Sequence, residues 1–194
     1  MTRLLTLIKP FWAICLLRLA PQDLPVSHLL LGVTLTVNLV CRTAVATVHF
    51  PFNSAVLVAL ANLVVVFLIV VALLQQAGKS QRIVQTVTAL AGAGILLNII
   101  ALPITVAIVG ARARGADSAG AELLLLGLRC WNWAIVAHVM RHALSVRFAT
   151  GAAIAFMLIV VTYLVLSAMF PNPALDSTNV AGQPTLAPGE DPLR

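Results

Sequence analysis

Charged residues are scarce in this chain, and acidic residues are the scarcest of them. Of its 194 residues, 9% are Asp, Glu, Lys or Arg, and 61% are hydrophobic. A soluble domain usually carries about 25% charged residues, so this composition leaves too little polar surface for a water-exposed fold. Only six residues are Asp or Glu, against twelve that are Lys or Arg. A soluble globular protein is therefore excluded, and the mean hydropathy of +1.04 indicates a membrane protein.

Residue patterns for disulfides, metal binding and hydrolytic catalysis are also missing from the sequence. The three cysteines, Cys15, Cys41 and Cys130, are isolated from one another, and no CxxC pair occurs. No HExxH or GxSxG motif and no paired aspartates lie in an apolar segment. His138 and His142 have the spacing of two metal ligands on one helix face, but no third ligand accompanies them. We therefore predict a protein without enzymatic activity, bound metal or cofactor.

What the sequence does contain is a series of five continuous apolar segments. The longest, residues 83–109, is uncharged and, at about 1.5 Å per residue, exceeds the ~30 Å hydrocarbon core of a bilayer. Because the segments are continuous rather than alternating, they indicate helices and not the strands of a membrane barrel. The predicted spans are residues 28–49, 54–74, 83–109, 121–141 and 148–170. The predicted fold class is an all-α membrane protein with five transmembrane helices and a short N-terminal interfacial helix.

Both ends of the chain differ from the predicted five-helix domain of residues 28–170. Residues 1–27 hold a short apolar stretch that Lys9 and Pro10 interrupt, followed by a turn that contains two further prolines. We predict an uncleaved helix that lies in the membrane interface, and the alternative is a sixth spanning helix. The tail, residues 171–194, is rich in Pro, Asn, Ser, Thr and Gly and lacks apolar periodicity, which predicts disorder.

Basic residues flank the spans unevenly, which indicates how the chain is oriented. With a cytoplasmic N-terminus, the inner segments carry seven of them: Arg3, Lys9, Arg18, Lys79, Arg82, Arg141 and Arg147. The outer segments then carry three: Arg112, Arg114 and Arg194. This predicts a cytoplasmic N-terminus and a periplasmic C-terminus. Ten Arg against two Lys, with abundant Ala, Leu and Val, is typical of a GC-rich bacterial genome, so we predict the bacterial inner membrane.

Polar residues inside the predicted spans are few, and most of them lie at one level. They are Asn38 and Arg42 in the first span, Asn62 in the second, Asn98 in the third, and Glu122, Arg129 and Asn132 in the fourth. Counted from the predicted span ends, most lie between the midplane and the outer surface. An arginine at the membrane centre costs about 2.5–3.5 kcal/mol, so such residues tend to face other helices. We predict one intramembrane polar cluster, in which Glu122 pairs with Arg42, and Arg129 rests on Asn side chains, carbonyls or water.

Two roles are open for this cluster. Its residues can act as hydrogen-bonding contacts between helices, worth about 0.6 kcal/mol per contact in measured cases. Alternatively, an incompletely neutralised arginine that faces a cavity can bind an anionic headgroup or solute. The small residues at positions 89–94 of the third span also allow a neighbouring helix to approach closely.

The order of these features resembles the Yip (Ypt-interacting protein) domain family. Three parts of the sequence carry the resemblance: WAICLL at 12–17 with PQDL at 21–24, QTVTAL at 85–90 running to Pro103, and RHALS at 141–145 before the last span. The resemblance implies a five-helix bundle without enzymatic activity that often acts through partner proteins. In eukaryotic relatives these partners are small trafficking GTPases. No catalytic or binding residue carries over from the family.

Two functions are therefore predicted, from different classes. The first is a non-enzymatic scaffold or assembly partner that acts through helix–helix contacts with another membrane protein or with a second copy of itself. The alternative is a small binder or transporter of an anionic lipid or solute that uses the arginine and asparagine cluster. Membrane lipids are expected partners in either case. No nucleic-acid partner is predicted, because the basic residues form no contiguous stripe.

Overall fold

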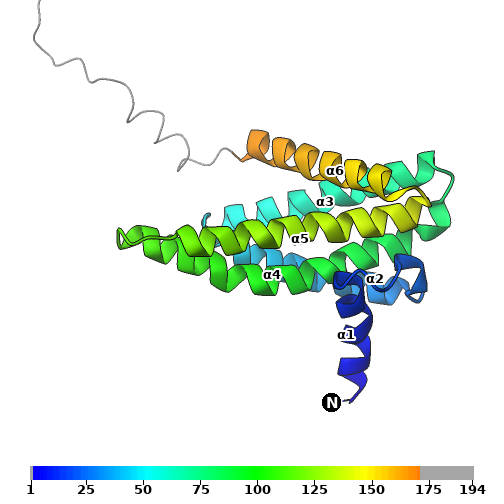
Figure 1. The fold of residues 1–194 in the computed structure, drawn as a ribbon, viewed down its shortest axis with the longest axis horizontal. Helices are drawn as coiled ribbons and strands as arrows, with labels where there is room; N and C mark the ends of the chain where they lie inside the picture. Colours follow the sequence, from blue (N-terminus) through cyan, green and yellow to red (C-terminus); the bar gives the residue numbers. More distant parts are fainter. Residues whose placement is uncertain (1, 171–194) are drawn as a thin grey trace, which may run out of the picture.

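Five long helices dominate the computed structural model, which describes residues 2–170 (Figure 1). In chain order the elements are α1 (Thr2–Cys15), η1 (Pro21–Asp23), α2 (His28–Ala46), α3 (Phe52–Gln76), η2 (Ser80–Arg82), α4 (Ile83–Ala113), α5 (Ala119–Leu144) and α6 (Phe148–Met169). This described part contains no β-strand, and α2 to α6 are each long and apolar enough to cross a membrane. The predicted class, an all-α membrane protein with five spans, is confirmed. The predicted disordered tail lies outside the described residues.

Helix ends follow the turn residues of the sequence. Pro51 immediately precedes α3, and the backbone N–H of Leu30 donates to Ser27 Oγ (3.2 Å), which caps the start of α2. Gly78 and Gly115, just beyond α3 and α4, have φ values of +68° and +65°. Residues that carry a side chain rarely adopt this left-handed backbone conformation, so a glycine follows the end of each of these helices.

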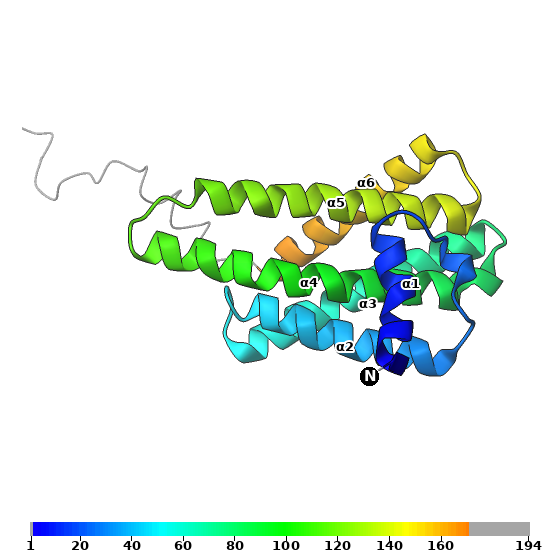
Figure 2. The same cartoon turned by 60° about the horizontal axis from the view of Figure 1, so that its bottom comes forward.

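Successive long helices run in opposite directions, so the loops gather at two ends of the bundle (Figure 1). The end with the turns at 77–79 and 145–147 lies closer to α1, and we call it the α1 end. The end with the loops at 47–51 and 114–118 is called the distal end. There α4 and α5 project beyond α2 and α3 (Figures 1 and 2). Helix α4 projects beyond α2 because it is longer, with 31 residues against 19.

Glycines allow two of the helix pairs to approach closely. A Cβ atom at Gly94 of α4 would lie 2.8 Å from Oδ1 of Asn38 on α2. A Cβ atom at Gly151 of α6 would lie 2.7 Å from Cβ of Arg141 and 2.9 Å from the carbonyl oxygen of Ala137, both on α5. Close backbone approach of this kind is how helices associate in lipid, where the hydrophobic effect adds little between them.

Helix α1 lies across the bundle rather than along it, as both views show (Figures 1 and 2). Its 14 residues span about 21 Å, which is shorter than the hydrocarbon core. Gly92 of α4 faces the ring of Phe11, and Nε1 of Trp131 on α5 donates to the carbonyl oxygen of Cys15 (2.9 Å). With Ile14 fully buried, α1 is docked on α4 and α5. The interfacial position of α1 stays a prediction, and its direction across the spans agrees with that prediction.

Replacing Gly92 by Ala is expected to undock α1 while the five-helix bundle stays folded, because a Cβ atom there would overlap the Phe11 ring. The readout is Cys15, since burial raises the pKa of this thiol to about 11 and suppresses the reactive thiolate. In a Cys41→Ala, Cys130→Ala background, undocking should accelerate maleimide labelling of Cys15 by about ten-fold or more.

The matched control is Gly127→Ala on α5, because a Cβ atom at that position meets nothing within 4 Å. Its labelling rate should equal that of the parent protein. If Gly92→Ala and Gly127→Ala label at the same slow rate, α1 is not held against α4 as described.

Candidate functional site

A cavity of about 560 Å³ lies inside the bundle, and all five spanning helices line it. Its volume falls within the roughly 300–1,000 Å³ that is usual for small-molecule sites. Of the seven polar residues singled out in the sequence, the structure brings five to this cavity: Asn38, Arg42, Asn62, Arg129 and Asn132. They come from three different helices, α2, α3 and α5. The two intramembrane arginines thus face one shared space.

Asn98 lies beside this group without lining the cavity. Its Nδ2 donates a hydrogen bond to Oδ1 of Asn38 (3.3 Å), and Gly94, one turn away on α4, leaves the room for Asn38 to approach. The Asn38–Asn98 pair therefore joins α2 to α4 directly behind the cavity wall. For Asn98 the structure shows a contact between helices.

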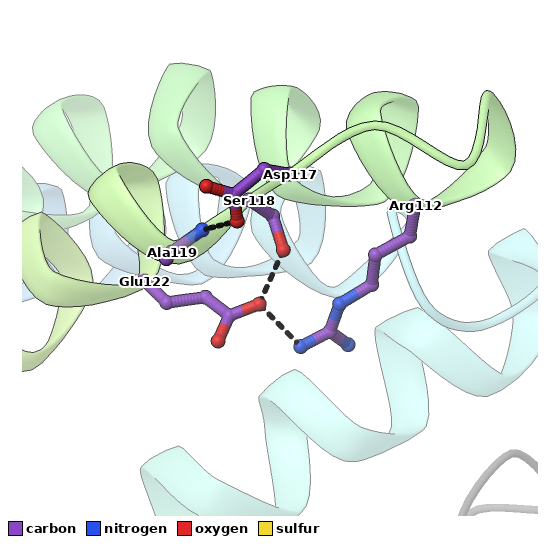
Figure 3. A network of polar contacts seen from close by, with 5 residues as sticks. All are labelled: Arg112, Asp117, Ser118, Ala119 and Glu122. Atoms are coloured by element: carbon purple, nitrogen blue, oxygen red, sulfur yellow. Dashed lines mark hydrogen bonds and ion pairs between the residues drawn. The ribbon is translucent and has the colours of Figure 1, made fainter.

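Glu122 lies outside the cavity, and the predicted ion pair between Arg42 and Glu122 is wrong. Figure 3 shows the carboxylate of Glu122 bound instead by Nη2 of Arg112 (2.9 Å) and by the hydroxyl of Ser118. These groups lie on the part of α4 and α5 that projects beyond α2 at the distal end. Glu122 is seven residues, or about 10 Å, nearer to the distal loop than Arg129. The carboxylate is consequently exposed and out of reach of the cavity.

Among residues 9–170, whose side chains the structure describes, the arginines of the cavity have no carboxylate partner. The single ion pair of this range is the one between Arg112 and Glu122, and no Asp or Glu lines the cavity. Across the same residues, the guanidinium groups of Arg42 and Arg129 donate no hydrogen bond to another side chain or carbonyl. The lining therefore carries two positive charges in a largely apolar surrounding, where a charge without a partner is costly.

Thr162 of α6 also lines the cavity, although no pattern in the sequence singles it out. Its side chain is 6% exposed, and its Oγ1 has no hydrogen-bond partner among the described residues. The four other buried threonines, Thr34, Thr86, Thr88 and Thr105, each donate to the carbonyl four residues earlier in their helix. Buried polar groups are almost always hydrogen-bonded. The Thr162 hydroxyl is thus a buried donor and acceptor without a partner, on a residue that lines the cavity.

The histidine pair noted in the sequence lies away from the cavity. The rings of His138 and His142 meet edge to face, with centroids 4.6 Å apart, and Nε2 of His138 lies 3.2 Å from the carbonyl oxygen of Leu19. Within the described part of the chain, no group of three His, Cys, Asp or Glu side chains is placed to hold a metal ion. The observed role of His138 is a contact with the segment that follows α1.

The imidazole of His49, in the loop after α2, is expected to report on the charge near Arg129. Burial, together with the positive charges of Arg112 and Arg129, lowers the pKa of its imidazole below the ordinary value. An anion bound beside Arg129 would offset that charge, so the His49 pKa should rise on binding. By linkage, the anion should bind more tightly as the pH falls and His49 becomes protonated.

An NMR titration of His49, with and without an anionic amphiphile such as decyl phosphate, measures this change. Arg129→Met should raise the His49 pKa in the unliganded protein, whereas Arg114→Met, which removes a charge that does not act on His49, should not. A His49 pKa that is identical in the free and saturated protein would mean that the anion binds elsewhere.

No protein-family model, curated protein or solved structure matches this chain. The resemblance to the Yip family therefore stays a prediction. The cavity and the residues that line it therefore provide the basis for a function.

Proposed function

We propose that this integral membrane protein binds an anionic ligand in the cavity between its five spans, with Arg42 and Arg129 holding the anion. The observation that supports the proposal is the convergence of two arginines on one cavity, which no Asp or Glu of the described residues lines. An arginine at the membrane centre costs about 2.5–3.5 kcal/mol, and one nearer to the interface costs less. An anionic ligand would supply the missing negative charge and offset that cost.

The chemistry of the lining suits an oxyanion. A guanidinium group offers a planar fork of N–H donors that fits carboxylate or phosphate oxygens two at a time. The amide groups of Asn62 and Asn132 provide neutral donors and acceptors beside the two charges. This arrangement binds and orients a ligand, and it lacks a nucleophile with an adjacent base. We accordingly propose a binding role without enzymatic activity.

We favour ligand binding over the scaffold role because the small residues of α4 are used within the chain. Ala89, Ala91 and Ala93 are buried inside this single copy, Gly92 faces α1, and Gly94 faces α2. This segment therefore presents no free surface for another membrane protein. The scaffold role, with another membrane protein or a second copy as partner, stays a prediction.

The proposed location is the inner membrane of a bacterium, with a cytoplasmic N-terminus and a periplasmic C-terminus. The uneven distribution of basic residues supports this orientation. It places the α1 end at the cytoplasmic side and the cavity arginines in the outer half of the membrane. A reporter fused after Phe170 should be active in the periplasm, and cytoplasmic activity would reverse the orientation.

Thermal unfolding of the full chain in a neutral detergent tests anion binding without assuming the kind of anion. The probes are inorganic phosphate, decyl phosphate and, as a zwitterionic control, decylphosphocholine. At least one of the two anions should stabilise the wild type, by about 2.7 kcal/mol at a hundred times its dissociation constant. The zwitterion should have little effect.

Two single variants locate the site of that effect. Arg42→Met should lose the stabilisation, whereas Arg112→Met should keep it because Arg112 lies outside the cavity. If neither anion stabilises the wild type, or if both variants respond as the wild type does, the proposed function is wrong.

A further inference from the structure

We propose that the anion is the headgroup of a membrane amphiphile, whose acyl chain lies along the apolar part of the same cavity. This inference rests on the proposed function and names the class of ligand. Four features of the cavity carry it: the order of its lining residues, its depth, its partial opening and the unpaired hydroxyl of Thr162.

Polar and apolar lining residues are separated along the helix axes, except that the apolar Leu166 of α6 lies one turn beyond Thr162 toward the distal end. On each of α2, α5 and α6, a polar lining residue lies nearer to the distal end than an apolar one. These pairs are Arg42 and Leu35, Arg129 and Val136, and Thr162 and Leu158. The lining residues of α3 follow the same order, and α4 contributes only apolar residues, all from its half nearer the α1 end. The cavity therefore has a cationic part and an apolar part, as a ligand with a charged head and a hydrocarbon tail requires.

The depth of the two parts matches that of a lipid in one leaflet. The 19 residues of α2 span about 28 Å, close to the ~30 Å thickness of the hydrocarbon core. Arg42 lies four residues before Ala46, or about 6 Å from the distal end of α2, so it is nearer to the headgroup region than to the midplane. Leu35 lies about 16 Å from the same end, near the midplane. A free oxyanion would leave this inner, apolar part of the cavity unfilled.

The cavity is partly open, and two of the residues that line it are also exposed at the surface of the bundle. Helix α6 lies beside α5 at the α1 end and diverges from it toward the distal end (Figures 1 and 2). Tyr163 and Arg129 belong to these diverging halves, and both are exposed although they line the cavity, Tyr163 to 64%. A lipid can therefore reach the arginines from within its leaflet, with its chain still in the membrane.

Thr162 supplies a hydrogen-bonding group between the two parts of the cavity. It lies one helical turn from Leu158, toward the distal end, and its buried hydroxyl has no partner among the side chains of residues 9–170. A phosphate or ester oxygen next to a hydrocarbon chain can accept its hydrogen bond. This hydroxyl thus fits the junction of head and chain.

Native mass spectrometry of the full chain in neutral detergent tests the inference with decyl phosphate and inorganic phosphate as probes. Decyl phosphate should bind at least about ten-fold more tightly than inorganic phosphate, because its chain buries apolar surface in the cavity. If inorganic phosphate binds as tightly, the ligand is a free solute, and the inference fails while the proposed function stands. If neither probe binds, both are wrong.

Filling the apolar part separates chain binding from headgroup binding. Val66 lines the cavity on α3, whereas Val64, two residues away, is 43% exposed and lies outside the lining. Val66→Trp should weaken decyl phosphate binding about ten-fold or more while inorganic phosphate binding is unchanged, and Val64→Trp should bind as the wild type does. Equal binding of decyl phosphate to both variants would overturn the inference.

A smaller change serves if Val66→Trp does not fold. Thr162→Val keeps the shape of the side chain and should weaken decyl phosphate binding by about three- to ten-fold. Thr105→Val is its control, because Thr105 is equally buried, donates to the carbonyl of Ala101 and does not line the cavity. Unchanged binding by Thr162→Val would show that the hydroxyl does not contact the ligand and would contradict the proposed position of the headgroup.

Discussion

A variant that carries both Arg42→Met and Arg129→Met is expected to be more stable than the wild type in the absence of ligand, and to have lost anion binding. Methionine is long, flexible and apolar, so it can occupy the space of each arginine stem without a charge. Removing two intramembrane charges that no carboxylate neutralises should stabilise the bundle by about 2–4 kcal/mol. Unfolding in mixed micelles of neutral detergent and dodecyl sulfate, followed by circular dichroism, measures this gain.

A loss of stability in this double variant would instead identify the two arginines as structural contacts between helices. Arg82 provides the comparison, because its Nη1 donates to the carbonyl oxygens of His142 and Ala143, each at 3.1 Å. Arg82→Met should therefore lose about 1–3 kcal/mol of stability. If the double variant of Arg42 and Arg129 is destabilised as Arg82→Met is, the two cavity arginines hold the helices together, and the proposed site is contradicted.

Replacing Gly151 by Val is expected to destabilise the bundle by about 3 kcal/mol and to separate α6 from α5. A Cβ atom at this position would lie 2.9 Å from the carbonyl oxygen of Ala137 and 2.7 Å from Cβ of Arg141. Neither atom can move away by a side-chain rotation, so one helix must shift. Because α6 carries Thr162, the same variant should also lose ligand binding.

Gly127→Val is the matched control for this change, since a Cβ atom at Gly127 of α5 meets nothing within 4 Å. Its stability should stay within about 0.5 kcal/mol of the wild type, as for other surface substitutions. Both variants are compared in the same mixed-micelle unfolding measurement. Equal stability of Gly151→Val and Gly127→Val would mean that α5 and α6 do not approach as closely as described.

The spans could be predicted from the sequence because an uncharged run of this length has only one stable form in lipid, a helix with its backbone groups paired internally. The run at 83–109 predicts where a helix crosses the membrane, but not how far it continues into water. Helix α4 extends to Ala113 and includes Arg112. This extension carries Arg112 to Glu122, so the carboxylate pairs with an arginine beyond the apolar run and not with Arg42.

The cavity could be predicted only in part. Asn38 and Arg42, four residues apart, share one helix face, as do Arg129 and Asn132, three residues apart, so each helix shows its polar side in the sequence. Which faces meet depends on the order and crossing of the helices, and the sequence does not contain that directly. Thr162 could not be predicted as a cavity residue, because a lone threonine in a span usually donates its hydrogen bond to the backbone of its own helix.

A crystal structure with an alkyl phosphate that carries bromine at the end of its chain would test the central claim most directly. The expected result is one phosphate within about 3 Å of guanidinium nitrogens of both Arg42 and Arg129. The anomalous bromine peak should then lie deeper in the cavity, beside Leu158 and Val70. A phosphate bound only on the outer surface of the bundle, or guanidinium groups that point to opposite sides of it, would contradict the account.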